Sequence, residues 1–223
     1  MKRRLPWCLA LVTGMAAAQV GPSAAEVASY GGLHAAAWRG NAAAVASADR
    51  AAVGARDGHG RTPLHVAAFA GQRDVVRALA KAGADLGALE NDRYDAVTIA
   101  TVADDQATLA VLLELGASAR LTTSRYDGTA LIAAAHLGHD GAVRQLIKAG
   151  APLDHVNNLH WTALIEAVVL GDGGKRHQQV VRDLLTAGAN TQLADRDGRT
   201  PLALARARGY AAMVRLLEAA GAR

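Results

Sequence analysis

The stretch RTPLHVAAFAGQRDVVRALAKAGADL (residues 61–86) has the pattern of two short helices separated by glycine. Thr62 can cap a helix N-terminus, and Pro63 then occupies the first helical position, where its missing N–H costs nothing. Gly71 and Gly83 are placed to end the two helices. The spacing therefore predicts a helix–turn–helix unit whose apolar stripe, rich in alanine, lets a neighbouring helix approach closely.

The same pattern recurs along the chain. GTALIAAAHLGHDGAVRQLIKAGAPL begins at Gly128, WTALIEAVVLGDGG begins at Trp161, and RTPLALARARGYAAMVRLLEAAGAR begins at Arg199. The anchor residues lie 33, 34, 33 and 38 positions apart and are Thr62, Asp95, Thr129, Thr162 and Thr200. One such helix pair cannot bury its own apolar face, so the copies are expected to stack on one another.

The repeat resembles that of the ankyrin repeat family. Thr62-Pro63-Leu64-His65, followed after one residue by Ala67, matches the family signature, and a period of 33 is the family period. The third copy departs from it, with an aspartate, Asp95, at the anchor. The resemblance implies an all-α fold, an ankyrin repeat solenoid of about six helix–turn–helix repeats with short hairpin loops. The repeats are expected near residues 31–61, 62–94, 95–128, 129–161, 162–199 and 200–223.

The first residues have the pattern of an export signal. A positive head, residues 2–4, precedes a short apolar run, Leu5–Ala18, which ends in three alanines before Gln19. We therefore expect a signal peptide at residues 1–18, with cleavage as late as residue 25, and a flexible lead-in at residues 19–30. An uncleaved anchor and a coincidental apolar leader are the alternatives. The run is shorter than the ~20 residues that span a bilayer, so no stable membrane insertion is expected after cleavage.

Composition and charge exclude several classes of function. The net charge of +4 includes the three cations of residues 2–4, so the remainder carries about one positive charge and lacks the excess typical of nucleic-acid binding. The single cysteine, Cys8, lies in the leader, so the mature chain would have neither disulfides nor thiolate metal sites. We expect a monomer without a cofactor.

An insertion interrupts the fifth copy. Five more residues separate Thr162 from Gly188 than separate Thr129 from Gly150, and they fall within Gly171–Gln178 in LGDGGKRHQQ. A phosphate-binding loop needs a preceding strand, whereas here a helix is expected. We interpret the insertion as a solvent-exposed loop, with a protein-contact loop and an anion site as the alternatives.

Histidines and serines give no pattern of a catalytic or metal site. The resemblance implies that His65, and similarly His34, bonds between adjacent repeats, and that His139 supports a helix–helix turn. No pair has the context of a zinc site, and no serine has a nucleophile motif. The sequence therefore predicts a protein that is not an enzyme and holds no metal.

The resemblance also implies a concave binding face built from hairpin tips and first helices. Its positions hold tryptophan, tyrosine and arginine, the residue types that dominate interface energetics. The alternative is that Trp161 and Tyr94 pack between hairpins. The expected protein-binding residues are Trp38, Arg39, His59, Arg61, Phe69, Asn91, Asp92, Tyr94, Arg125, Tyr126, His136, Asn158, Trp161, Arg196 and Arg199.

These observations favour a non-enzymatic scaffold of the bacterial periplasm that binds a partner protein and stabilises, for example, an envelope enzyme. A secreted effector that binds a host protein is the alternative. An enzyme or metal protein that uses the Gly171–Gln178 insertion is the third hypothesis.

Overall fold

The computed structural model describes residues 21–223; the expected signal peptide and its cleavage before Gln19 lie outside them. The regular secondary structure of the described residues is all helical. Turns and loops connect the helices, and one isolated β-bridge joins Thr123 and Gly128. The helices are α2 (Ala24–Ser29), α3 (Gly32–Arg39), α4 (Ala42–Ala46), α5 (Arg50–Val53), α6 (Pro63–Phe69), α7 (Arg73–Lys81), α8 (Ala96–Val102), α9 (Gln106–Glu114), α10 (Ala130–Leu137), α11 (Asp140–Lys148), α12 (Ala163–Val169), α13 (Lys175–Thr186), α14 (Pro201–Arg208) and α15 (Ala211–Ala219).

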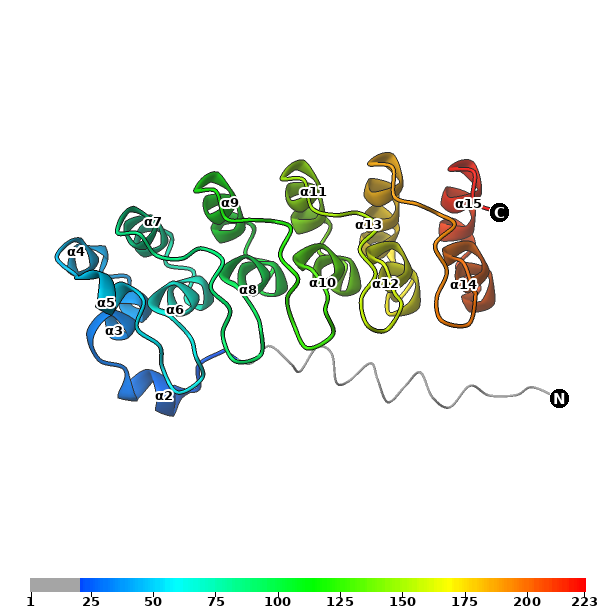
Figure 1. Cartoon of the computed structure of the whole chain (residues 1–223). Helices are drawn as coiled ribbons and strands as arrows, with labels where there is room; N and C mark the ends of the chain where they lie inside the picture. The colour runs from blue at the N-terminus through cyan, green and yellow to red at the C-terminus, as the bar shows by residue number, and fades with distance from the viewer. Residues whose placement is uncertain (1–20) are drawn as a thin grey trace.

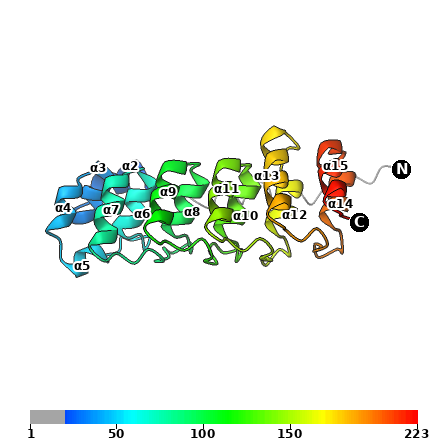
Figure 2. The ribbon, with the colours of Figure 1, turned by 90° about the horizontal axis from the view of Figure 1, so that it is seen from above.

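The helices form two stacked layers (Figure 1). The inner layer contains α3, α6, α8, α10, α12 and α14, and the outer layer contains α4, α7, α9, α11, α13 and α15. Seen from above, the pairs follow one another along one axis (Figure 2). Each of the six expected repeats therefore supplies one inner and one outer helix, and the predicted all-α solenoid is confirmed.

Side-chain caps begin four of the inner helices, α8, α10, α12 and α14, at the anchor positions. The hydroxyl of Thr162 accepts a hydrogen bond from the backbone N–H of Ile165 at 3.2 Å, and Thr129 and Thr200 make the equivalent bond at 3.3 Å. In the third repeat the carboxylate of Asp95 replaces the threonine hydroxyl and accepts from the N–H of Thr98 at 2.8 Å. The departure from the signature at Asp95 therefore preserves the cap.

One continuous apolar core runs along the stack between the layers. The leucine two residues after each threonine anchor is almost wholly buried, and so is one leucine in most outer helices. These residues are Leu64, Leu131, Leu164 and Leu202 in the inner layer and Leu79, Leu112, Leu146, Leu184 and Leu217 in the outer layer. Each repeat thus buries its apolar face against its neighbours.

The expected flexible lead-in contains an ordered helix, so that expectation is corrected. Ser23 and Glu26 form a reciprocal capping box at the start of α2. Glu26 forms an ion pair with Arg61, and the hydroxyl of Tyr30 donates to Asp57 at 2.9 Å. Residues 23–30 therefore cover the first hairpin. The sequence signal for this helix was the Ser-x-x-Glu spacing of Ser23 and Glu26.

The insertion in the fifth repeat is partly exposed and partly helical. Asp172 and Arg176 are exposed, but α13 begins at Lys175 and has 12 residues, whereas the other long outer helices have nine. His177 donates to the carbonyl oxygen of His136 at 3.0 Å. One repeat earlier, His139 bonds the carbonyl oxygen of Thr101 at 2.9 Å, through Nδ1 where His177 uses Nε2. The insertion thus protrudes between Gly171 and His177, and the bond to the preceding repeat is kept.

Deletion of Asp172–Arg176 is expected to leave the melting temperature nearly unchanged. The deletion joins Gly171 to His177 and recreates the Gly-His turn present at residues 138–139. It removes the ion pair of Arg176 with Asp104, but exposed pairs contribute only about 0–1 kcal/mol.

His177→Ala is the matched control for this deletion, because it removes the bond to the His136 carbonyl and the contact with Asp172 at 2.9 Å but leaves the inserted residues in place. It should cost about 1 kcal/mol or more, since a partly buried acceptor loses its donor. Thermal unfolding followed by circular dichroism compares the two variants. A larger loss for the deletion than for His177→Ala would show that the insertion itself is packed.

Candidate functional site

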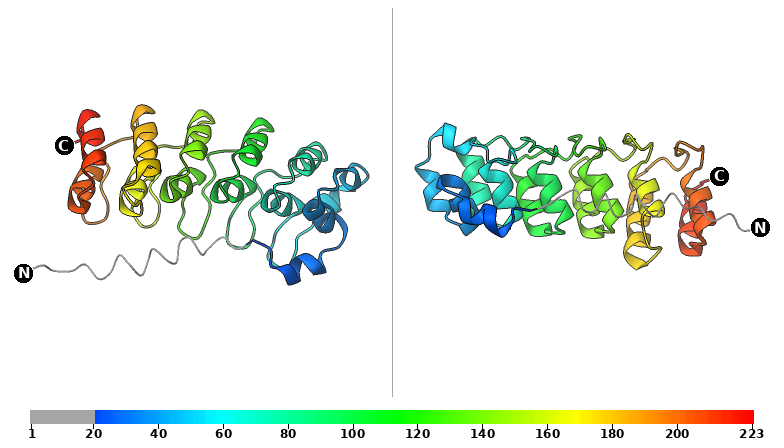
Figure 3. Two further views of the ribbon diagram at one scale, coloured as in Figure 1. Left: turned by 180° about the vertical axis from the view of Figure 1, so that it is seen from behind. Right: turned by 90° about the horizontal axis from the view of Figure 1, so that it is seen from below.

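The hairpins that connect successive repeats form a row along one edge of the stack (Figure 3). Backbone hydrogen bonds join their tips. The N–H of Asn91 donates to the carbonyl of His59, and the N–H of Asn158 donates to the carbonyl of Tyr126, both at 3.0 Å. The N–H of Ser124 donates to the carbonyl of Arg93 at the same distance. The hairpin tips therefore form a preformed surface that needs little ordering when it binds.

The predicted binding residues divide into three groups by exposure. Seven are exposed, six are half-buried, and two are buried. The exposed members of the predicted set, apart from Asp92, are Arg39, His59, Asn91, Arg125, Asn158 and Arg196. Trp38, Phe69, Tyr126, His136, Trp161 and Arg199 are intermediate, and Arg61 and Tyr94 are buried. Asp92 is exposed and pairs with Arg125 at 3.3 Å.

Arg61 supports the first hairpin and is not an exposed contact residue. Only 3% of its surface is accessible, and its guanidinium pairs with Asp57 at 2.8 Å and with Glu26. Although burial acts to raise it, the pKa of Asp57 is held below its ordinary value by hydrogen bonds from Arg61. Arg199 pairs with Asp195 in the last hairpin at 2.7 Å, in the same positions of its repeat. The concave-face assignment of Arg61 is therefore corrected.

Tyr94 is also largely buried, at 8% exposure. Burial raises the pKa of its phenol to about 12, so the hydroxyl keeps its proton at neutral pH. Its backbone carbonyl accepts a hydrogen bond from Nε2 of His65 at 3.1 Å. Tyr94 is therefore not an exposed contact residue, and its side chain lines a pocket.

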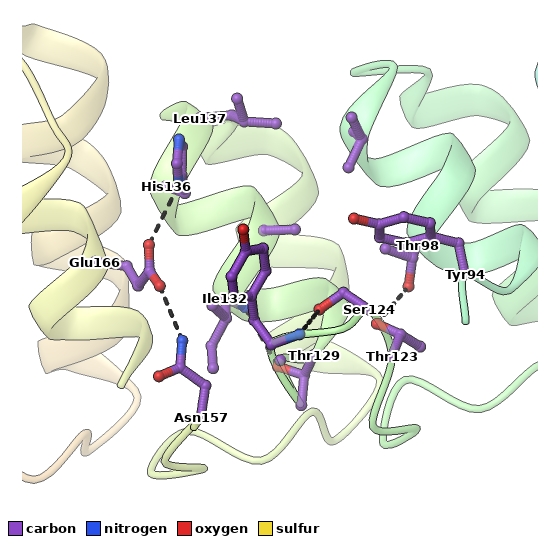
Figure 4. Close-up of a pocket in the computed structure, with 14 residues that line it drawn as sticks. Tyr94, Thr98, Thr123, Ser124, Thr129, Ile132, His136, Leu137, Asn157 and Glu166 are labelled. Atoms are coloured by element: carbon purple, nitrogen blue, oxygen red, sulfur yellow. Dashed lines mark hydrogen bonds and ion pairs between the residues drawn. The ribbon is translucent and has the colours of Figure 1, made fainter. Parts of the chain in front are cut away.

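This pocket, which we call the central pocket, lies across the third, fourth and fifth repeats and has a cavity volume of about 60 Å³ (Figure 4). Tyr94 and Thr98 line one side, and Glu166 and Asn157 lie at the other end. Its remaining lining residues are Val102, Thr123, Ser124, Tyr126, Gly128, Thr129, Ile132, Ala133, His136 and Leu137. The central pocket thus combines two tyrosines, aliphatic side chains and a few polar groups, as binding pockets commonly do.

Glu166 is a wholly buried carboxylate at the end of the central pocket. Its Oε1 accepts from Nδ2 of Asn157 at 3.0 Å, and its Oε2 accepts from Nδ1 of His136 at 3.2 Å (Figure 4). These two hydrogen bonds compensate part of the cost of removing a carboxylate from water. His136 was among the predicted binding residues, whereas Glu166 and Asn157 were not.

A signal for Glu166 was nevertheless present in the repeat alignment. The same position, four residues after the anchor, holds Val66, Ile99, Ala133 and Leu204 in the other repeats. A charged residue at an otherwise apolar or small position departs from the core pattern.

The hairpin before α12 departs from its neighbours in a matching way. It has Asn157 and Trp161 where the first and last hairpins have an aspartate and an arginine. The side-chain oxygen of Asn157 accepts from the N–H of Trp161 at 2.9 Å, so the amide nitrogen is left to donate to Glu166. An aspartate could make the first bond but would not donate the second.

The histidines tie the repeats together. Nε2 of His34 donates to the carbonyl of Arg61 at 2.8 Å, and Nε2 of His155 donates to the carbonyl of Asp127 at 2.6 Å. The His34 and His65 bonds each reach the residue directly before the next anchor, so they join an inner helix to the hairpin that leads into the following repeat. Within residues 21–223, no group of three or more histidine, aspartate or glutamate side chains is placed to hold a metal ion. In the same range, no helix is long and apolar enough to cross a membrane.

Comparison with known proteins identifies the family. A family model described as ankyrin repeats (3 copies) matches residues 33–123 and 99–195. The chain therefore belongs to the ankyrin repeat family, whose repeats form protein-binding scaffolds that are typically non-enzymatic.

Relatives and solved structures agree with this assignment. The chain is similar to the putative ankyrin repeat protein YahD of Escherichia coli K12, with 36% identity over 167 residues, or 74% of this chain and 83% of that protein. It is also similar to the crystal structure of an ankyrin repeat domain from Acinetobacter baumannii AYE, with 44% identity, a TM-score of 0.80 and coverage of 86% and 98% of the two chains. The human ASB11 ankyrin repeat domain, at 23% identity and a TM-score of 0.68 over 87% and 85% of the chains, shares the fold.

Proposed function

We propose that this ankyrin repeat protein is exported to the periplasm of a bacterium and binds a partner protein there through its concave face. The observation that carries the proposal is the arrangement of Tyr126, Trp161 and His136. Each is half-buried, and they belong to consecutive hairpins and the inner helix between them. Such partly exposed aromatic side chains on a preformed surface are favourable anchors for a protein partner.

The export step rests on the leader sequence. A positive head, an apolar run too short to span a bilayer and a small-residue cleavage site are the pattern of a secretory signal. A rigid concave surface that holds a folded partner also stabilises it by mass action, and an envelope enzyme is the partner class we propose. Fractionation of the source cells tests the compartment, since protein found only in the culture medium would instead support an effector that acts on a host protein.

The double variant Trp161→Ala with Tyr126→Ala is expected to lose partner binding by about 100-fold or more, because each aromatic anchor contributes on the order of 2 kcal/mol. The measurement is capture of periplasmic proteins on immobilised chain from Gln19 to Arg223, followed by mass spectrometry and titration of the captured partner.

The matched control is Arg77→Ala with Arg215→Ala, two exposed positions on outer helices. This pair should leave binding unchanged. Thermal unfolding of both double variants separates loss of binding from loss of structure. If the control pair and not the aromatic pair abolished binding, the partner would contact the outer layer and the concave-face proposal would fail.

A further inference from the structure

The central pocket has an unbalanced charge. Glu166 is the only carboxylate among its lining residues, and no lysine or arginine lines it. Within the described chain, the hydrogen-bond partners of Glu166 are an amide and an imidazole, and no lysine or arginine forms an ion pair with it. The buried Glu166 carboxylate therefore has no permanently cationic partner in the pocket, and charge interactions are strong in such surroundings of low dielectric constant.

The imidazole of His136 contacts the buried Glu166 carboxylate and is itself partly exposed. Its Nδ1 is used in the bond to Glu166, whereas Nε2 has no hydrogen-bond partner among residues 21–223. The imidazole side chain is 12% exposed, although Glu166 itself is inaccessible to solvent. A bound group can therefore contact His136 directly and experience the charge of Glu166 across a short distance.

The aromatic and aliphatic side chains that line the rest of the central pocket suit a planar cationic group carried on methylene groups. Tyr94 and Tyr126 supply aromatic surface, and in Figure 4 the Tyr94 ring reaches into the pocket from the side opposite Glu166. Ile132 and Leu137 supply the apolar wall. A guanidinium group stacks on aromatic rings and donates several hydrogen bonds in one plane, while its methylene stem packs against aliphatic side chains.

We propose that the central pocket receives an arginine side chain of the partner protein. This inference rests on the proposed function, because it names the chemistry of the residue that a protein partner inserts beside the hairpin tips. Arginine fits better than a purely apolar residue because the buried Glu166 carboxylate has no lysine or arginine partner in the described chain. It fits better than an acidic residue because Glu166 would repel a second carboxylate.

The test uses the isolated protein and small probes. The chain has four isoleucines, Ile99, Ile132, Ile147 and Ile165, so its isoleucine methyl NMR spectrum is simple. Ile132 lines the central pocket, and Ile147 lies on the outer helix α11 as an internal control. The probes are N-acetyl-arginine amide and N-acetyl-citrulline amide, which have nearly the same shape but differ in charge, at pH 8, where histidine side chains are ordinarily neutral.

The arginine probe is expected to shift the Ile132 methyl signal in a saturable manner and to leave Ile147 unchanged. The citrulline probe should bind about tenfold more weakly, since it lacks the charge-assisted interaction. In Glu166→Gln, which keeps the side-chain shape, the two probes should bind equally. Tyr126→Leu should weaken the binding of the arginine probe, because it removes aromatic surface while Glu166 stays in place. It provides a second variant if Glu166→Gln does not fold.

Equal binding of the two probes to the unmodified protein would overturn the arginine proposal, as would an unchanged preference in Glu166→Gln or the absence of any shift at Ile132. The proposed function is judged separately by partner capture. If a partner is captured in a manner that depends on Trp161 and Tyr126 while the probes do not bind, the scaffold stands and the arginine pocket does not.

Discussion

Leu131→Ala is expected to lower the free energy of unfolding by about 2–5 kcal/mol. Leu131 has no accessible surface, and its helix α10 packs against α8, α11 and α12. Truncation to alanine removes buried methyl groups and leaves a cavity that four helices must close together. Urea unfolding followed by circular dichroism measures the loss. Leu137→Ala is the matched control on the same helix, because Leu137 is only partly buried and should cost clearly less.

The position of Leu131 in the middle of the solenoid adds a second expected result. Each repeat contacts only its neighbours, so a weakened fourth repeat separates the first three from the last two. The unfolding transition should broaden, and amide hydrogen exchange should accelerate most within α10 and α11. A sharp transition with uniform exchange, or a loss below about 1 kcal/mol, would show that the neighbouring helices collapse into the space.

The solenoid could be predicted from sequence because its determinants are local and recur. A threonine cap, a proline at the first helical position and a glycine after the helix act within one repeat, and the period then places each apolar face against the next. Asp95 shows the limit of a motif. It breaks the signature, yet a carboxylate accepts the same capping bond as the hydroxyl, so the helix begins where the register requires.

The contacts of the N-terminal segment could not be predicted in the same way. The Ser23–Glu26 spacing indicates a capping box, but a helix of six residues is not stable by itself. It is held by the Glu26–Arg61 pair and by the bond from Tyr30 to Asp57, which join residues about 30 positions apart. Arg61 was consequently assigned to the binding face, although it is buried between the N-terminal helix and the first hairpin, where it pairs with Glu26 and Asp57.

The central pocket was missed for a related reason. His136, Tyr126 and Tyr94 could be predicted because their residue types favour binding, whereas Glu166 was given no role. The partners of Glu166 lie 9 and 30 residues before it, on a hairpin and on the preceding inner helix. Only the stacking of two repeats brings these groups together. Comparing equivalent positions among the repeats would have flagged Glu166, because the others hold apolar or small residues there.

Acidification from pH 7 to pH 4.5 is expected to cost about 2.5 kcal/mol of stability through His65 alone. Burial lowers the pKa of His65 to about 4, from an ordinary value of 6.5, despite the raising effect of its bond to Tyr94. The pattern of hydrogen bonds at the two ring nitrogens of His65 also favours the neutral imidazole, and therefore a lowered pKa. Nδ1 accepts from the N–H of Thr62 at 3.1 Å while Nε2 donates to the carbonyl of Tyr94, and only a neutral imidazole can do both.

The unfolded chain therefore takes up a proton at His65 near pH 6.5, whereas the folded chain resists it until about pH 4. Stability from the neutral imidazole is complete above pH 6.5 and is lost as the pH falls toward 4. Urea unfolding at pH 7 and pH 4.5 measures this loss in the unmodified protein and in His65→Gln. The variant should be less stable at pH 7 but should lose about 2.5 kcal/mol less on acidification, because every other titrating group is shared. An equal loss in both proteins would mean that His65 accepts its proton in the folded state, and that the bond from Thr62 does not hold the imidazole neutral.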